Sequence, residues 1–132
     1  AAEAEARESR LGNWPVQLKL LPPVSPVFRG ADILIAADCT AYAFAGFHER
    51  FIAGHTVIIA CPKLDATDYS EKLQQIFMLN DIKSIVVTRM QVPCCGGLVR
   101  MVQAAMEQSG KAIPCEVYII SNSGQILNKE TI

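Results

Sequence analysis

The chain has 132 residues, of which 51% are hydrophobic and 19% are charged, and its net charge at pH 7 is −1. This length and composition are typical of one globular domain and unlike a disordered chain. The balanced charge gives no electrostatic reason to expect nucleic acid or an anionic membrane as a partner. No apolar run approaches the roughly 18 residues that a membrane-spanning helix needs.

The chain begins with a polar lead-in. We expect residues 1–13 to be mobile or helical and residues 14–132 to form a single cysteine-rich α/β domain. The lead-in contains no apolar segment of the kind found in secretory signals, so we expect a cytoplasmic protein. Val16, Leu18 and Leu20 then alternate with polar residues. This alternation predicts a short half-buried strand.

From residue 31 onward, continuous apolar runs alternate with amphipathic segments. Such runs are typical of strands buried on both faces of a parallel sheet, and amphipathic segments are typical of the helices that cover it. We therefore expect an α/β fold with a mainly parallel, Rossmann-like sheet flanked by helices in three layers. The expected strands are 32–38, 56–61, 84–90 and 116–121, the expected helices are 41–52, 68–79 and 96–109, and residues 125–130 are a candidate edge strand.

The five cysteines carry the strongest functional signal. Their odd number argues against a disulfide scaffold, and clustered thiols in an intracellular chain indicate metal or redox chemistry, with buried apolar thiols as the alternative. Cys39 follows the first expected strand, Cys61 ends the second, and Cys94 and Cys95 follow the third. All four are therefore expected at the carboxyl edge of the sheet, where α/β proteins place their functional crevice. Cys115 opens the fourth strand at the opposite edge, where we expect a structural thiol.

Four thiols at one edge are enough to fill a tetrahedral zinc site or to hold an iron–sulfur cluster. Gly96 and Gly97 follow the cysteine pair at the expected start of a helix, where their backbone N–H groups could donate to sulfur and bind a cofactor. The chain lacks the paired C-x₂-C segments common in zinc sites. A cluster, of 4Fe–4S or 2Fe–2S type, therefore fits at least as well as zinc, and a redox dithiol is a further alternative.

Other candidate residues carry weaker signals. Asp38 and Asp65 are expected at the same edge as the cysteines, where they could relay protons or bind a cation, although helix capping is the commoner role of such residues. His48 lies among charged residues and is expected to be solvated. The sequence has no G-x-G-x-x-G segment after its first strand, so we do not expect a dinucleotide site.

Three segments, ADILIAADCTAYAFAGFH, IIACPKLD and MQVPCCGGLV, resemble the C-terminal domain of ferredoxin-like iron–sulfur proteins of anaerobic bacteria and archaea. The similarity extends from about residue 11 to about residue 121. It implies that the four edge cysteines belong to the family pattern and that Cys115 does not. In that family a two-cluster ferredoxin module precedes the domain, and its cysteine runs do not occur in this chain. The resemblance therefore implies a ferredoxin module or an oxidoreductase subunit as the electron partner.

These observations predict an iron–sulfur electron-transfer domain whose cluster is held by Cys39, Cys61, Cys94 and Cys95. One alternative is a thiol-dependent enzyme in which Cys94 or Cys95 is a nucleophile activated by the helix start. Another is an interaction module stabilised by zinc. Catalytic activity and self-association are both left open by the sequence.

Overall fold

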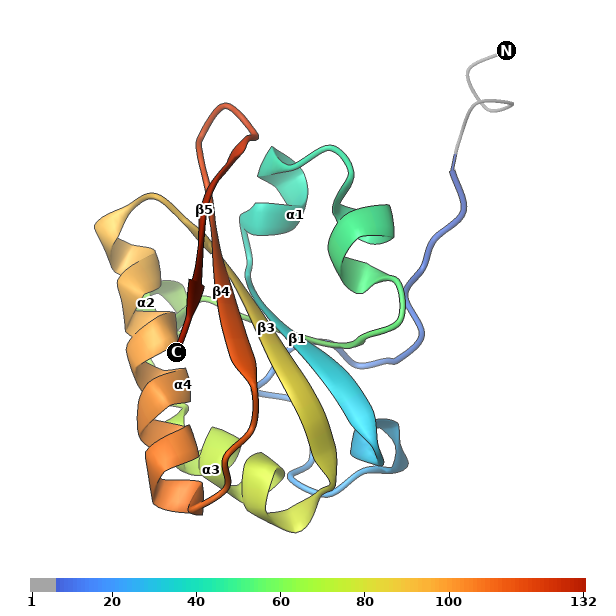
Figure 1. The fold of residues 1–132 in the computed structure, drawn as a ribbon, viewed down its shortest axis with the longest axis vertical. Helices are drawn as coiled ribbons and strands as arrows, with labels where there is room; N and C mark the ends of the chain where they lie inside the picture. Colours follow the sequence, from blue (N-terminus) through green and yellow to red (C-terminus); the bar gives the residue numbers. More distant parts are fainter. Residues whose placement is uncertain (1–6) are drawn as a thin grey trace.

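The computed structural model describes residues 7–132, apart from the side chain of Cys94 (Figure 1). Its centre is a five-stranded sheet with the strand order β2-β1-β3-β4-β5. Four strands are parallel, and the last one pairs with β4 in antiparallel orientation at the edge. The strands are β1 (Ala31–Ala37), β2 (Thr56–Ala60), β3 (Ile82–Met90), β4 (Cys115–Ile120) and β5 (Ile126–Thr131).

Helices cover both faces of the sheet, and a hydrophobic core lies on each side of it. One core is closed by α3 (Ser70–Leu79) and α4 (Gly96–Ser109), and the other by α1 (Thr40–Ala43) with a five-residue π-type turn, η3 (His48–Ile52). This mainly parallel, three-layer α/β architecture confirms the expected fold class. The remaining short elements are η2 (Pro26–Phe28), α2 (Pro62–Asp65) and η4 (Pro93–Cys95).

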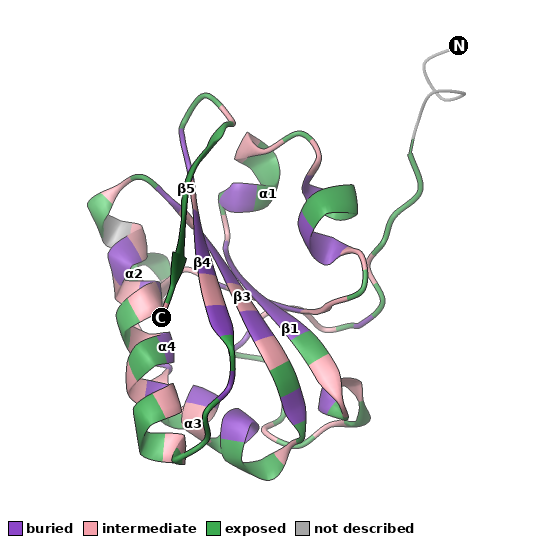
Figure 2. Cartoon of the chain, in the orientation of Figure 1, coloured by how far each residue is buried: buried purple, intermediate pink, exposed green. Residues whose placement is uncertain are grey.

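The expected strands are confirmed, with ends that differ by one or two residues from the sequence-based bounds. Five consecutive residues of β1, from Ile33 to Ala37, are buried, as two covered faces require. Strand β5 was the candidate edge strand, and all six of its residues are exposed (Figure 2). It extends the sheet beyond the area that the helices cover.

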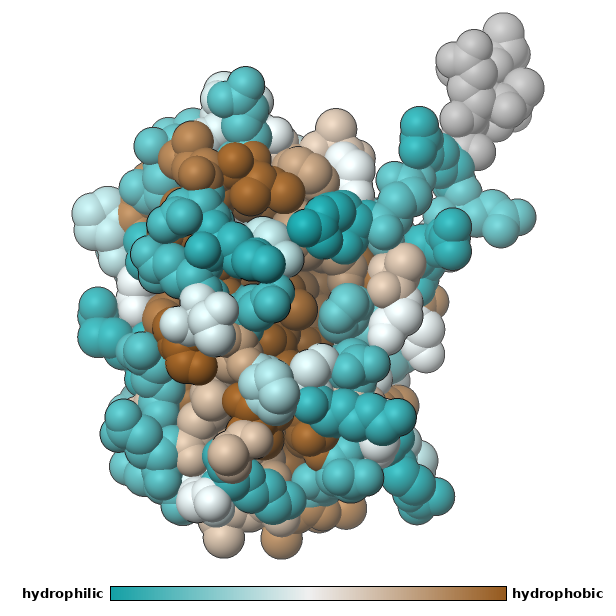
Figure 3. Space-filling view, in the orientation of Figure 1, coloured by the Kyte–Doolittle hydropathy of each residue, from teal (hydrophilic) through white to brown (hydrophobic). Residues whose placement is uncertain are grey.

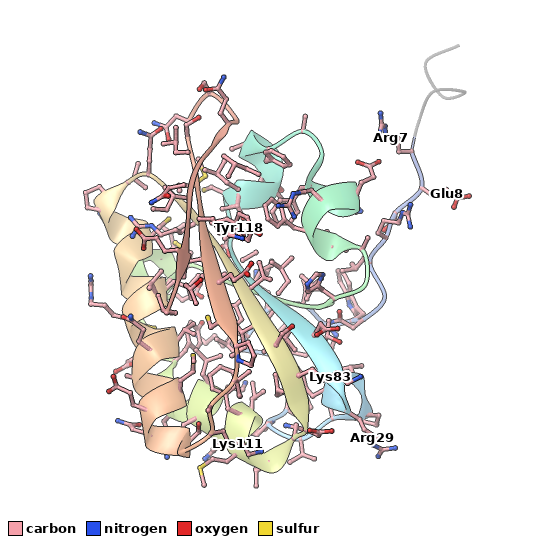
Figure 4. All side chains as sticks on the ribbon, in the orientation of Figure 1. Arg7, Glu8, Arg29, Lys83, Lys111 and Tyr118 are labelled. Atoms are coloured by element: carbon pink, nitrogen blue, oxygen red, sulfur yellow. The ribbon has the colours of Figure 1, made fainter. Side chains whose placement is uncertain are left out.

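The expected helix over residues 41–52 is wrong, because the chain forms two short pieces instead. Phe44 ends α1 with an extended backbone, at φ −100° and ψ 112°, so the helix cannot continue. The helical spacing of the phenylalanines reflects side-chain packing. The Phe51 ring centroid lies 5.5 Å from that of Phe44, 5.4 Å from that of Phe47 and 5.2 Å from that of Tyr118. Tyr118 is labelled on β4 in Figure 4.

The strand predicted from Val16 to Leu20 is also wrong. The segment runs beside the outer edge of β2 and makes a single parallel bridge there, between Gln17 and Ile59. The backbone then turns, because the N–H of Leu20 donates to the carbonyl of Gln17 at 2.9 Å. This turn leaves Leu20 68% exposed, while Leu18 is fully buried. Residues 7–13 have no regular secondary structure, and the rest of the expected lead-in, residues 1–6, lies outside the described residues.

Hydrophilic residues cover much of the face drawn in Figure 3, with hydrophobic residues in separate patches between them. Two large side chains, Tyr42 on α1 and Leu64 on α2, are 94% and 80% exposed. Over the described part of the chain, no helix has both the length and the apolar character needed to cross a membrane.

Candidate functional site

The strand order creates a crevice at the carboxyl edge of the sheet. Strand β1 lies between β2 and β3, so the chain leaves β1 toward one side and later crosses to the other side. At such a switch point the loops after the two central strands diverge, and α/β sheets bind ligands there. Cys39 follows β1, and η4 with Cys94 and Cys95 follows β3. The topology therefore places Cys39, Cys94 and Cys95 at the switch point, while Cys61 follows the edge strand β2.

A pocket of about 70 Å³ lies at this edge and brings together three of the four expected ligands. Cys39, Cys61 and Cys95 come from three separate segments and all line it. Asp38 is the one charged residue in the lining, and the other residues around the pocket are apolar. They are Ala37, Ala60, Pro62, Met90, Val92 and Leu98.

The size of this pocket limits what it can hold. Pockets for organic ligands usually measure about 300–1,000 Å³, whereas one water needs only about 10–15 Å³. A volume of about 70 Å³ is therefore too small for a flavin or a dinucleotide. Larger surface hollows, of about 480 Å³ beside Tyr69 and about 490 Å³ beside Leu79, contain no cysteine.

The loop of Cys39 is tied to two strands by a buried hydroxyl. Thr40 is fully buried, and its Oγ1 donates to the carbonyl of Ala37 at 2.7 Å. The Oγ1 of Thr88 on β3 lies 3.0 Å from the same hydroxyl and can donate to it. The Cys39 carbonyl accepts from the N–H of Ala43 at 3.1 Å. These hydrogen bonds fix the backbone of the loop, while the Cys39 side chain is exposed.

The loop of Cys61 is held by a carboxylate and a phenol. The N–H of Cys61 donates to Oδ2 of Asp65 at 3.4 Å, and the Tyr69 hydroxyl donates to the same oxygen at 2.6 Å. Burial and the bond to Asp65 raise the pKa of Tyr69 to about 12, so the phenol keeps its donating proton at neutral pH. Asp65 is the last residue of α2 and ties the end of this turn back to Cys61; it does not cap the helix that follows, α3, which was the expected role.

The cysteine pair lies where η4 passes directly into α4. Cys95 is the residue before α4 and its side chain is partly buried. The N–H of Gly96 donates to the carbonyl of Pro93, so this amide is engaged in the turn instead of being open to a cofactor. The role of the Gly97 backbone N–H as a donor to a cofactor stays a prediction. The Cys94 side chain lies outside the described residues, so its role as a ligand stays a prediction as well.

Two arginines that the sequence analysis missed lie beside the start of α4. A Cβ atom at Gly96 would be 3.5 Å from Nη1 of Arg89 and 3.3 Å from Nη1 of Arg100. Arg89 also donates to the carbonyls of Met90 and Val92, and neither arginine has an ion-pair partner within residues 7–132. With the helix dipole, these cations favour negative charge at the start of α4, although neither arginine lines the pocket. One sequence feature could have pointed to Arg89: it is the one charged residue in the expected strand 84–90.

Asp38 does not cap the helix that follows it, α1, as we expected, because no side chain caps that helix. Its Oδ1 is buried and, among the described side chains, is the one buried nitrogen or oxygen atom without a hydrogen-bond partner. Burial raises the pKa of this carboxyl group, and repulsion from the Asp65 carboxylate raises it further. The sequence placed Asp38 at the correct edge, but only the structure shows that its oxygen is unpaired.

Cys115 is the structural thiol that we expected. It begins β4, pairs with Ile85 and is 1% exposed inside the core under α3 and α4. Burial raises the pKa of its thiol to about 12. His48 is exposed, also as expected, and its Nδ1 accepts from the N–H of Arg10.

The ligand set as a whole stays a prediction. Among the described residues, which do not include the Cys94 side chain, no three His, Cys, Asp or Glu side chains are arranged to share one metal ion. The finding concerns a single ion. In a cluster each thiolate binds a different iron atom, so the ligands are spaced farther apart than the ligands of one ion.

The sequence pattern of the Rossmann-like domain family matches residues 25–132. The chain belongs to this family. An uncharacterized protein of Archaeoglobus fulgidus is 40% identical to this Rossmann-like domain over 115 residues, which are 86% of this chain and 81% of the archaeal protein. No solved structure matches the chain.

These comparisons correct the resemblance drawn from the sequence. The matching family is a Rossmann-like domain, and neither it nor the archaeal relative is described as an iron–sulfur or ferredoxin-like protein. The assignment to the C-terminal domain of ferredoxin-like proteins is therefore wrong. The cysteines of this chain and their surroundings are the remaining support for a cluster.

Proposed function

We propose that this Rossmann-like domain holds an iron–sulfur cluster in the pocket at the switch point and transfers electrons. The observation that supports this most directly is that Cys39, Cys61 and Cys95, from three separate segments, line one small pocket. Cys94 is the fourth proposed ligand on the basis of its position in η4 next to Cys95. The pocket is too small for an organic redox cofactor, whereas thiolates are the usual ligands of a cluster.

A bound cluster would supply one-electron chemistry. The chain would contribute the ligands, an apolar lining that limits access of water, and an exposed side near Cys39 through which an electron could pass. The exposed side chains of Tyr42 and Leu64 follow Cys39 and Cys61 and would contact a docked partner. We propose an oxidoreductase subunit or a separate ferredoxin module as that partner.

The charges at the start of α4, beside the cysteine pair, suit an anionic group. A cluster with thiolate ligands carries net negative charge, which hydrogen bonds and nearby cations stabilise. The N-terminus of the 14-residue helix α4 and the guanidinium groups of Arg89 and Arg100, which lie beside Gly96, provide positive potential next to the cysteine pair. These groups would also tune the reduction potential of a bound cluster.

The direct test is anaerobic reconstitution of the full chain with iron and sulfide. Wild-type protein is expected to retain both and to absorb in the visible range. Cys39→Ser and Cys61→Ser are expected to lose most of the iron and the absorption, while Cys115→Ala, in the core away from the pocket, keeps them. Urea denaturation of each variant shows whether the domain stays folded. A wild-type protein that retains neither iron nor sulfide contradicts the proposal, and a colourless protein with bound zinc supports the zinc-stabilised module instead.

A thiol-dependent enzyme is the second candidate, because Cys95 lies directly before α4 and beside two arginines. Positive potential of this kind favours the reactive thiolate. In protein that holds no metal, iodoacetamide is expected to modify Cys95 faster than Cys61, as measured by peptide mass spectrometry over time. Arg100→Gln is expected to slow the reaction at Cys95 while leaving the rate at Cys61 unchanged. Equal rates at Cys95 in both proteins contradict this candidate.

A further inference from the structure

Cys39 and Cys61 leave the sheet from neighbouring strands. Strands β1 and β2 are parallel and stay paired to their last residues, with Ala37 opposite Ala60. Cys61 is the first residue after β2, and Cys39 is the second residue after β1. Paired strands lie about 4.7–4.9 Å apart, so the register brings these two cysteines to adjacent positions at the carboxyl edge of the sheet.

The two cysteines also share one small space. Both line the pocket of about 70 Å³ at this edge. A disulfide requires Cα atoms within about 7 Å of each other, a separation that the strand register and a pocket of this size allow. Two thiols are enough for this bond, whereas no three His, Cys, Asp or Glu side chains of the described residues are placed to share a metal ion.

The loops that carry the two thiols are fixed and reachable from solvent. The Cys39 side chain is exposed and that of Cys61 is partly exposed, so a molecule from outside reaches Cys39 first. The hydroxyl of Thr40 donates to the carbonyl of Ala37 at 2.7 Å, and the N–H of Cys61 donates to Asp65 at 3.4 Å. Because these bonds hold both loops in place, less entropy is lost when the two sulfurs meet.

The strand register favours this pair over the other described thiols. Cys95 lies five residues beyond Met90, the end of β3, so strand pairing does not place it beside a second cysteine. Cys115 is 1% exposed in the core under α3 and α4, where an external disulfide cannot reach it. Cys39 and Cys61 are therefore the pair that both the topology and the exposure select.

We propose that Cys39 and Cys61 form a dithiol site that exchanges with disulfide substrates. The Cys39 thiolate attacks one sulfur of the substrate disulfide, whose S–S bond breaks and releases one thiol. The Cys61 thiolate then attacks the Cys39 sulfur of this mixed disulfide and releases the second thiol. The protein loses two electrons and two protons, and the substrate disulfide gains them. The inference goes beyond the proposed function, because the exchange occurs in protein that holds no metal.

The experiment equilibrates the metal-free full chain with mixtures of reduced and oxidised glutathione under anaerobic conditions. The reaction is stopped with acid, free thiols are blocked with N-ethylmaleimide, and tryptic peptides are identified by mass spectrometry. Trypsin cleaves after Arg50, so Cys39 and Cys61 come on different peptides, and cleavage after Arg89 separates both from Cys95. The same titration is made in urea-unfolded wild type, in Cys39→Ser and in Cys115→Ala.

In folded wild type, the peptides of Cys39 and Cys61 are expected to be joined. The equilibrium constant for this bridge is expected to be at least about tenfold larger than in urea, because a bridge that fits a fold is favoured by that fold. Cys115→Ala is expected to form the same bridge, whereas Cys39→Ser releases only one glutathione thiol for each Cys61 that reacts.

Equal equilibrium constants in folded and unfolded protein overturn the inference, because the fold then does not bring the two thiols together. A bridge from Cys61 to Cys95 with Cys39 free also overturns it. The proposed function is tested separately by iron and sulfide content. A chain that forms the bridge but retains no iron loses the proposed function and keeps this inference, and a chain that retains iron but forms no bridge does the reverse.

Discussion

Gly124 shows how one residue determines the position of a loop near the candidate site. It lies in the turn between β4 and β5 with a φ of +86°, a conformation that residues with a Cβ atom adopt only with strain. A Cβ atom there would also collide with the carbonyl oxygen of Ala43, at the end of α1. The hairpin therefore rests against the short helix that follows Cys39, as Figure 1 shows.

Gly124→Ala is expected to destabilise the domain more than Gly54→Ala. Gly54 has a similar φ of +78° but open space around it, so its replacement costs only the backbone strain, about 1–2 kcal/mol. Gly124→Ala adds a collision with backbone, and overpacking of this kind costs about 1–3 kcal/mol more. Urea denaturation of both variants measures the difference. Equal losses of unfolding free energy would mean that the hairpin does not press on α1.

Cys115 gives a pH dependence whose sign follows from its burial. The pKa of its thiol is about 12 in the folded protein, against an ordinary value of 9.0. Between these values the folded state keeps a proton that the unfolded state releases. Its contribution to stability is therefore complete below about pH 9 and declines as pH rises toward 12, by at most about 1.4 kcal/mol per pH unit.

Cys115→Ala is expected to show a shallower loss of stability than wild type between pH 8 and pH 11. Tyr69, with a pKa also raised to about 12, contributes in the same direction and stays in both proteins, so some slope persists in the variant. The measurement is the melting temperature of metal-free protein at several pH values. A pH slope identical to that of wild type would show that the thiol already ionises in the folded state.

At the scale of elements, the outer edge of β2 is closed by the segment that precedes the sheet. The side chain of Asn13 pairs with both backbone groups of Val57: its Oδ1 accepts the N–H at 2.8 Å, and its Nδ2 donates to the carbonyl at 2.9 Å. Farther along, the N–H of Leu18 donates to the carbonyl of Ile59. These bonds replace a neighbouring strand and leave fewer unpaired groups at the edge.

Asn13→Ala is expected to lower the free energy of unfolding by about 2–4 kcal/mol, because it leaves two buried backbone groups of Val57 unpaired. Ser9→Ala, on the exposed part of the same segment, is expected to stay within about 0.5 kcal/mol of wild type. Urea denaturation gives both values, and hydrogen exchange at the Val57 amide reports the local opening directly. Unchanged protection of that amide in Asn13→Ala would contradict the role of the side chain.

At the scale of the whole molecule, the folded unit extends beyond the matched family pattern. That pattern begins at residue 25, yet Leu18 and Leu21 are 0% and 3% exposed and belong to the core under α3 and α4. Burying a leucine stabilises a protein by about 1.5–3 kcal/mol. The segment before residue 25 therefore contributes a large part of the 5–15 kcal/mol that is typical of a domain.

A chain that starts at Ser25 is expected to be unfolded or to lose more than about 4 kcal/mol of stability, from the two leucines together with the pairing at the β2 edge. A chain that starts at Arg7 retains all of the contacts described above and serves as the control. Circular dichroism and urea denaturation of the two chains make the comparison. A cooperative unfolding transition of equal midpoint in both would show that the segment adds nothing to the core.

The alternation of apolar and amphipathic segments was enough to predict the layers and the parallel strands, because strands buried on both faces need continuous apolar runs such as ILIAA in β1. The same pattern wrongly predicted a continuous helix over residues 41–52, where side chains pack against residues that are distant in the sequence. Phe44, Phe47 and Phe51 have helical spacing, but Phe44 and Phe47 pack on Phe51, which itself packs on Tyr118 of β4, instead of forming one stripe on a continuous helix. Local spacing does not reveal which distant residue an aromatic ring will meet.

The sequence by itself determined the edge at which Cys39, Cys61, Cys94 and Cys95 lie, because residues that follow parallel strands come to the same end of a sheet. Only the tertiary structure decided what surrounds them. The strand order β2-β1-β3 puts the switch point beside Cys39, and the approach of Arg89 and Arg100 to Gly96 sets the charge at the start of α4. The unpaired oxygen of Asp38 was equally invisible in the sequence, because a missing hydrogen bond depends on every neighbour that the fold brings near.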